Sequence, residues 1–134
     1  MKILLAACNA KYIHSNLAVY DLRAYASAYQ EHILLGEYTI NQTKDEILKD
    51  IYLSGADVVC FSCYIWNISF VRDLLEDLHK ILPDVKFWTG GPEVSFDAEA
   101  FLRRTPQVTG VMVGEGEKTF LELVRYYVDG VGTL

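Results

Sequence analysis

Five short apolar segments alternate with five amphipathic segments along the chain, and this alternation limits the folds open to it. The apolar segments are residues 3–7, 35–40, 57–63, 85–89 and 108–113. Apolar residues at helical spacing occur in residues 16–31, 43–54, 67–82, 97–104 and 117–128. Strands separated by helices form a parallel sheet covered on both faces, with right-handed crossovers. We therefore predict an α/β protein with a doubly wound, five-stranded parallel sheet.

Several residues mark where the expected helices begin and end. Thr43 is followed three residues later by Glu46, which is the pattern of a capping box, and Gly55 is suited to end that helix. Asn67 can cap the next helix, and Pro83 stops it. The strand order is not written in the sequence. For five strands the expected order is 2-1-3-4-5, which is the flavodoxin-like variant of a Rossmann-like sheet.

Composition excludes several classes of function. The chain has 134 residues, enough for one domain, and its net charge of −6 with scattered basic residues argues against nucleic-acid binding. The apolar start of the chain is too short to span a membrane. An odd number of cysteines without a signal peptide favours a reducing compartment, so we expect a cytoplasmic protein. Cys60 and Cys63 would point to opposite faces of a strand, which argues against a metal pair.

The ligand site of such a sheet lies beyond the carboxyl ends of the strands. In this chain the loops at that edge are residues 8–15, 62–67, 90–96 and 114–117. A dinucleotide site needs G-x-G-x-x-G after the first strand, but the loop there begins Cys8-Asn9-Ala10-Lys11. The P-loop motif, the acidic residues of phospho-receivers and the hydroxyl-rich phosphate loop of flavodoxins are also missing from the sequence.

Two glycine turns distinguish this edge of the predicted sheet. The fourth strand ends in Gly90-Gly91-Pro92, and the fifth ends in Gly114-Glu115-Gly116-Glu117, followed by Thr119-Phe120. Each turn alone is explained as an ordinary tight turn. Together, at this spacing, they resemble the cobalamin-binding domain that precedes the barrel of cobalamin-dependent radical SAM proteins. The resemblance extends over nearly the whole chain.

The resemblance implies how the loops would hold the cofactor. The corrin ring would lie over the strand ends, and the nucleotide tail would run down beside the sheet, with room made by Gly90 and Gly91. Ser62 could hydrogen-bond this tail, and Trp66 offers a flat apolar surface, although a partly buried core tryptophan explains it equally well. The implied cofactor-binding residues are Asn9, Ala10, Lys11, Tyr12, His14, Ser62, Tyr64, Ile65, Trp66, Asn67, Gly90, Gly91, Pro92, Glu93, Val94, Gly114, Glu115 and Gly116.

One departure concerns the cobalt ligand. Cobalamin mutases and methionine-synthase-type domains carry D-x-H-x-x-G after the first strand, and its histidine binds cobalt from below. His14 is the candidate here, but it lacks the Asp two residues before it and the Gly three residues after it. Many radical SAM relatives lack the motif too. A capping or loop-packing role for His14 is favoured, and ligation of cobalt is the alternative.

The resemblance also implies a domain organisation. Residues 1–129 would form the cobalamin-binding domain, and residues 130–134 would begin a linker to a radical SAM domain as its partner. That second domain would bind S-adenosylmethionine and a [4Fe-4S] cluster through C-x-x-x-C-x-x-C, a motif this chain does not contain. The parent enzyme would perform methyl transfer or oxidative cyclisation, and the isolated chain would not turn over.

Two other functions stay open from the sequence. The domain could be vestigial, binding no cofactor and only packing against its partner domain, because fold alone does not establish function. It could also be a receiver-like or nucleotide-binding switch, although the motifs for either are missing. In all three readings we expect neither nucleic acid nor membrane as a partner.

Overall fold

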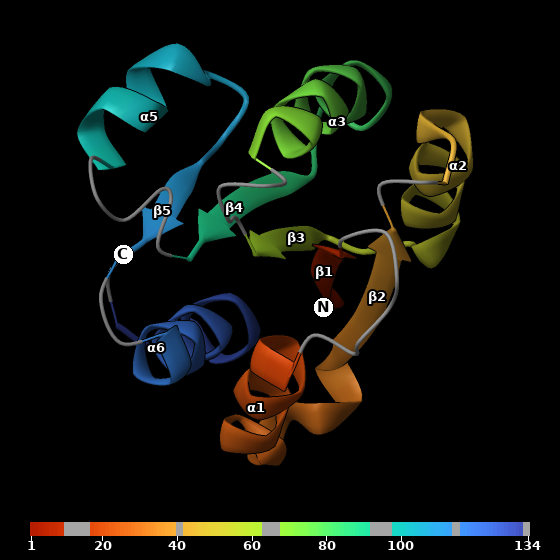
Figure 1. The fold of residues 1–134 in the computed structure, drawn as a ribbon. Coiled ribbons are helices and arrows are strands. Elements are labelled where there is room, and N and C mark those ends of the chain that lie inside the picture. The colour runs from red at the N-terminus through yellow and green to blue at the C-terminus, as the bar shows by residue number, and fades with distance from the viewer. Residues whose placement is uncertain (10–16, 40–41, 63–67, 92–97, 114–115, 133–134) are drawn as a thin grey trace.

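The fold is a sheet between two layers of helices, as the computed structural model shows (Figure 1). The structure describes residues 1–9, 17–39, 42–62, 68–91, 98–113 and 116–132. The strands are β1 (Ile3–Asn9), β2 (Ile33–Thr39), β3 (Val58–Ser62), β4 (Lys86–Gly90) and β5 (Gly110–Met112). The helices are α1 (Leu17–Tyr25), η1 (Ser27–His32), α2 (Lys44–Ser54), α3 (Ile68–Ile81), α5 (Ala98–Arg104) and α6 (Gly116–Asp129).

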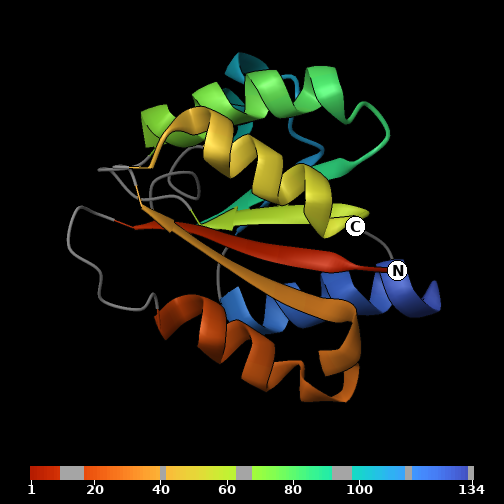
Figure 2. The same ribbon diagram turned by 90° about the vertical axis from the view of Figure 1, so that its right-hand side faces the viewer.

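The sheet confirms the predicted topology. All four strand pairs are parallel, and their order is β2-β1-β3-β4-β5. Helices α1 and α6 cover one face, and helices α2, α3 and α5 cover the other (Figure 1). The arrowheads of the strands point to the same side of the molecule (Figure 2), so their carboxyl ends form one edge. Among the residues that the structure describes, no helix is long and apolar enough to cross a membrane.

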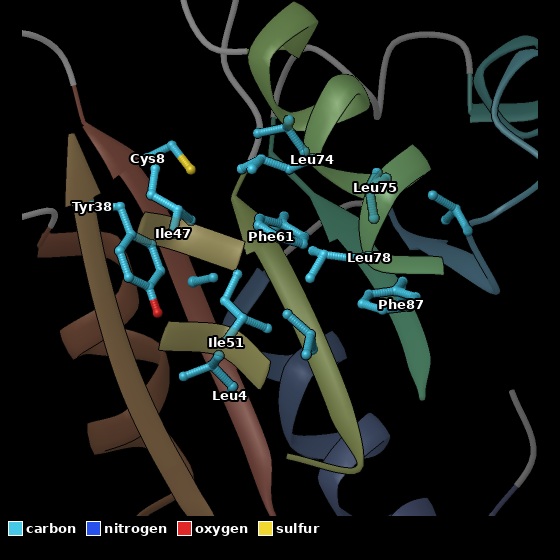
Figure 3. Packing of buried hydrophobic residues seen from close by; sticks show 14 of the residues in the cluster. Leu4, Cys8, Tyr38, Ile47, Ile51, Phe61, Leu74, Leu75, Leu78 and Phe87 are labelled. Carbon is cyan, nitrogen blue, oxygen red and sulfur yellow. The ribbon is translucent and has the colours of Figure 1, made fainter. Parts of the chain in front are cut away.

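The larger core lies between the sheet and helices α2, α3 and α5. Helix α3 has a strong apolar stripe, and its Leu74, Leu75 and Leu78 are fully buried against Phe61 and Phe87 of the central strands (Figure 3). Residues three and four apart share one face of a helix, so this stripe faces the sheet along the length of α3. The burial of long side chains from both layers stabilises the packing of these elements.

The second core lies between the sheet and helices α1 and α6. The sheet contributes alternate residues of its strands, among them Leu5, Cys60 and Trp88, and α6 contributes Phe120 and Leu123. Because side chains alternate along a strand, β1, β3 and β4 each supply both cores. This explains why β1 and β3 are almost continuously apolar and why β4 carries Phe87 and Trp88 in succession.

The predicted ends of α2 are confirmed in detail. The Thr43 hydroxyl accepts a hydrogen bond from the backbone N–H of Glu46 at 3.2 Å, as an N-cap residue does. Gly55 follows the helix with a φ of 68°, and its N–H donates to the carbonyl of Tyr52. This left-handed conformation suits a glycine that has no Cβ to clash with the backbone.

The segment predicted as one helix over residues 16–31 is divided in two, so that prediction is wrong in its length. Helix α1 ends at Tyr25, and the 3₁₀ turn η1 follows, with Tyr29 at a φ of −112° outside helical values. Ala26, at the junction, is buried against the sheet. The Tyr29 hydroxyl donates to Asp129 at 2.6 Å and so links η1 to the end of α6. These contacts with distant parts of the chain turn the backbone away from a straight helix.

Candidate functional site

A row of small residues crosses the carboxyl edge of the sheet. In the strand register, Ala7 of β1 is paired with Ser62 of β3, Ser62 with Gly90 of β4, and Gly90 with Met112 of β5. Ala7 and Met112 both belong to the core on the α1/α6 side. Side chains of residues paired in register point to the same face of the sheet. The Ser62 side chain therefore points to the α1/α6 side, and so would a side chain at Gly90. We call these four residues the edge row.

Gly90 carries no side chain, and Met112 fills the room beside it. A Cβ atom built at Gly90 would lie 3.2 Å from Cε and 3.5 Å from Cβ of Met112. The space beside Gly90 is therefore bordered by the Met112 side chain, while Ser62 and Ala7 continue the row with little bulk. A flat or narrow group would fit here, between the sheet and the α1/α6 layer, only with the Met112 side chain displaced.

The residue after the row shows why the turn contains a second glycine. Gly91 has a φ of 107°, a backbone conformation that residues with a Cβ rarely adopt. The glycine pair thus has two separate uses, with Gly90 leaving space beside the sheet and Gly91 permitting the turn.

The start of α6 approaches the same edge. Helix α6 begins at Gly116, which lies close enough to α1 that an added Cβ would be 3.6 Å from Cδ2 of Leu22. The Thr119 hydroxyl donates to the carbonyl oxygen of Val113 at 3.3 Å, which ties the first turn of α6 to the end of β5. Glu117 in this turn is favoured by the positive end of the helix dipole, as expected from the sequence.

Toward the amino ends of the strands, the residues next to the edge row include a large side chain that is held in place. The next residue of β4 on the same face is Trp88, whose indole N–H donates to the Tyr127 hydroxyl at 2.9 Å. The two rings meet edge to face, with centroids 6.5 Å apart. A ring that is both packed and hydrogen-bonded has little freedom to move. Any ligand beside Gly90 would therefore end above Trp88.

Two buried thiols near the site are chemically inert. Burial raises the pKa of the Cys8 thiol to about 12 and raises the pKa of Cys60 as well. A raised pKa means that the thiolate is disfavoured, so both groups stay protonated at neutral pH and are poor nucleophiles and metal ligands. Among the residues that the structure describes, no group of three His, Cys, Asp or Glu side chains is placed to hold a metal ion.

The structure brings three of the candidate residues together and leaves most of the others undescribed. Ser62, Gly90 and Gly91 lie side by side at the carboxyl edge, and Gly116 starts the helix that closes this side. Asn9 is the last residue of β1. The remaining candidates lie outside the described residues: Ala10, Lys11, Tyr12, His14, Tyr64, Ile65, Trp66, Asn67, Pro92, Glu93, Val94, Gly114 and Glu115.

Sequence reasoning missed two members of the edge row, Ala7 and Met112. In the sequence, Ala7 is an ordinary residue of the first apolar segment, and Met112 is an ordinary residue of the fifth. The signal that identifies them is their register, because both lie level with Ser62 and Gly90 across the sheet. Register across parallel strands is fixed by tertiary pairing, so the sequence alone did not align them.

Comparisons with known proteins agree with this geometry. Residues 3–124 match the family described as the B12 binding domain. A cobalamin-dependent radical SAM methyltransferase, TokK from Streptomyces tokunonensis, is 34% identical over 68 residues, which cover 51% of this chain. That match spans only 10% of TokK, so this chain corresponds to a small part of its relative.

Two solved structures share the fold. The cobalamin-dependent S-adenosylmethionine radical enzyme OxsB superposes with a TM-score of 0.73 and 19% identity, over 98% of this chain and 19% of that one. A cobalamin-binding protein from Desulfitobacterium hafniense superposes with a TM-score of 0.65 and 15% identity, over 98% of this chain and 59% of that one. The sheet order, the glycine turn beside the edge row and the match over residues 3–124 lead to one conclusion: this chain belongs to the B12-binding domain family.

Proposed function

We propose that this chain is the cobalamin-binding module of a larger cobalamin-dependent radical SAM enzyme. The observation that carries the proposal is the edge row, in which Ala7, Ser62 and Gly90 place three small residues side by side where a parallel sheet binds its ligands. The corrin would lie over the carboxyl edge, and its nucleotide tail would enter beside Gly90 on the α1/α6 side. Bound cobalamin supplies a cobalt centre able to carry a methyl group.

The residues of the chain would bind and orient the cofactor. The Ser62 hydroxyl would hydrogen-bond the tail, and the fixed Trp88 ring would set the depth to which the tail enters. The core on this side of the sheet is apolar, which suits an uncharged aromatic base better than a phosphate. The loops after β1, β3 and β4 would supply backbone groups for the amides of the corrin.

The parent enzyme would have two parts. Residues 1–129 would form the module, residues 130–134 would begin a linker, and the partner would be a radical SAM domain of the same parent chain. S-adenosylmethionine and a [4Fe-4S] cluster would bind in that domain, for methyl transfer or oxidative cyclisation. The similarity to TokK, a cobalamin-dependent radical SAM methyltransferase, supports the methyl-transfer class.

One observation favours a second candidate function, the vestigial module. The Met112 side chain already lies beside Gly90, with its Cε 3.2 Å from a Cβ built there. If that side chain cannot leave, the space is closed, and the domain would serve only to pack against its partner. The two candidates therefore differ in whether the chain retains a corrinoid.

Binding of hydroxocobalamin separates the two candidates. The folded chain is mixed with excess hydroxocobalamin and desalted, and the visible spectrum is read against the protein concentration. We expect about one corrinoid to stay with each chain, and equilibrium dialysis extends detection to a Kd of about 0.1 mM, or about −5.5 kcal/mol. The same chain unfolded in urea is the control and should retain none.

A thermal measurement checks the same proposal independently. A ligand that binds only the folded chain stabilises it by about 2.7 kcal/mol at a hundredfold excess over Kd, so the Tm should rise by several degrees. A folded chain that shows neither a Tm shift nor bound corrinoid in dialysis would contradict the proposal and favour the vestigial module.

A further inference from the structure

Met112 is the one bulky member of the edge row, and it lies over the space that Gly90 leaves. It is the last residue of β5 and is 92% buried, with an exposed fraction of 8%. Its Cε and Cβ lie 3.2 and 3.5 Å from the place of an added Gly90 Cβ. The thioether and its methyl group thus fill part of the volume where a ligand beside Gly90 would be.

Met112 differs from its buried neighbours in how easily it can move. A methionine side chain is unbranched, has three rotatable bonds and fills irregular spaces in several rotamers. Trp88, directly below, is held by its hydrogen bond to Tyr127. β5 is the edge strand of the sheet and has only three residues, and Val113 after it is 51% exposed. The end of β5 is therefore less enclosed than the central strands, and we expect a rotated Met112 side chain to turn toward this edge.

We infer that Met112 closes the space beside Gly90 in the ligand-free chain and rotates away when a complete cobalamin enters. This inference rests on the proposed function and goes beyond it, because it makes Met112 the residue that sets selectivity between corrinoids. A corrinoid with a nucleotide tail must displace the side chain. Cobinamide, which has the corrin ring but no nucleotide tail, leaves it in place.

Methyl NMR on the unaltered chain tests the movement directly. The sequence contains only two methionines, so [ε-¹³C]methionine labelling gives two signals, from Met1 and Met112. Hydroxocobalamin should shift the Met112 signal strongly, and cobinamide should shift it little at equal saturation. Met1, 49% exposed at the amino end of β1, is the internal reference and should not move. Equal shifts of Met112 with both ligands would contradict the inference.

Truncation of the side chain tests the selectivity. Met112→Ala should raise the association rate of hydroxocobalamin about tenfold, the factor that equals a displacement cost of about 1.4 kcal/mol, and should leave that of cobinamide unchanged. The matched control is Val111→Ala, which shortens the preceding residue of β5 on the opposite face, against the α3/α5 core. Far-UV circular dichroism checks that both variants fold. If Met112→Ala does not fold, the methyl NMR experiment still tests the inference, because it uses the unaltered chain.

The outcomes separate this inference from the proposed function. If the unaltered chain and Met112→Ala both fail to bind either corrinoid, the proposed function and the inference fall together. If the unaltered chain binds hydroxocobalamin while the Met112 methyl signal stays in place, only the inference falls. Binding of hydroxocobalamin by Met112→Ala alone would contradict the inference, because Met112 would then stay in place in the unaltered chain, and it would favour the vestigial module.

Discussion

Replacing Gly110 with alanine is expected to lower the free energy of unfolding by about 1–3 kcal/mol, the usual result of adding a methyl group to a filled core. The new Cβ would lie 2.4 Å from Cζ3 and 2.7 Å from Cη2 of Trp88, closer than non-bonded carbon atoms approach. The indole cannot easily retreat, because it packs against Tyr127 and donates a hydrogen bond to it. Urea unfolding followed by far-UV circular dichroism measures the change.

Gly116→Ala is the matched control for this substitution. A Cβ there would lie 3.6 Å from Cδ2 of Leu22, an ordinary contact distance, so its free energy of unfolding should not fall and should rise by up to about 1 kcal/mol. Replacing glycine also restricts the unfolded chain equally in both variants, which opposes the loss by about 0.4–1 kcal/mol. Equal midpoints for Gly110→Ala and the control would show that Trp88 does not fill the space over Gly110.

Replacing Gly90 with valine is expected to weaken hydroxocobalamin binding about 100-fold or more, equal to about 2.7 kcal/mol or more. The valine side chain would crowd Met112, whose Cε lies 3.2 Å from the place of an added Cβ, and would block the position proposed for the tail. The φ of Gly90 is not positive, and valine suits a strand, so the chain should still fold. Equilibrium dialysis with hydroxocobalamin measures the loss.

The control for this variant is Thr89→Val, one residue earlier in β4. Side chains alternate along a strand, so Thr89 points to the opposite face, away from the edge row. Its hydroxyl is fully buried and has no hydrogen-bond partner among the described residues, so valine, which has the same shape, should not destabilise the chain. Cobalamin binding should be unchanged in Thr89→Val, and an equal loss in both variants would mean that the tail does not enter beside Gly90.

The arrangement of the sheet could be predicted because each strand carries its own signal. The apolar segments around Ile3 and Val58 are continuous because helices cover both faces, and the caps of α2 are local patterns of a few residues. The predicted ends of the strands were less accurate. The second strand begins at Ile33, two residues earlier than predicted, because Ile33 pairs with Ile3 and is buried between the layers.

The candidate site could be predicted only in part. Gly90, Gly91 and Ser62 carry local signals, since small residues at strand ends suggest close approach of another group. The approach of Met112 to Gly90, and of Trp88 to Gly110, depends on register and rotamers across strands that lie far apart in the sequence. Such contacts are tertiary, and no window of neighbouring residues contains them.

The most direct test of the account is to map hydroxocobalamin onto the chain by amide NMR. In a titration of the ¹⁵N-labelled chain, the amide signals of Ser62, Gly90 and Met112 should shift most, since they line one row at the carboxyl edge. Signals at the amino ends of the same strands should stay in place. Largest shifts in the charged groove between α3 and the segment after α5, around Arg72 and Arg104, would contradict the account.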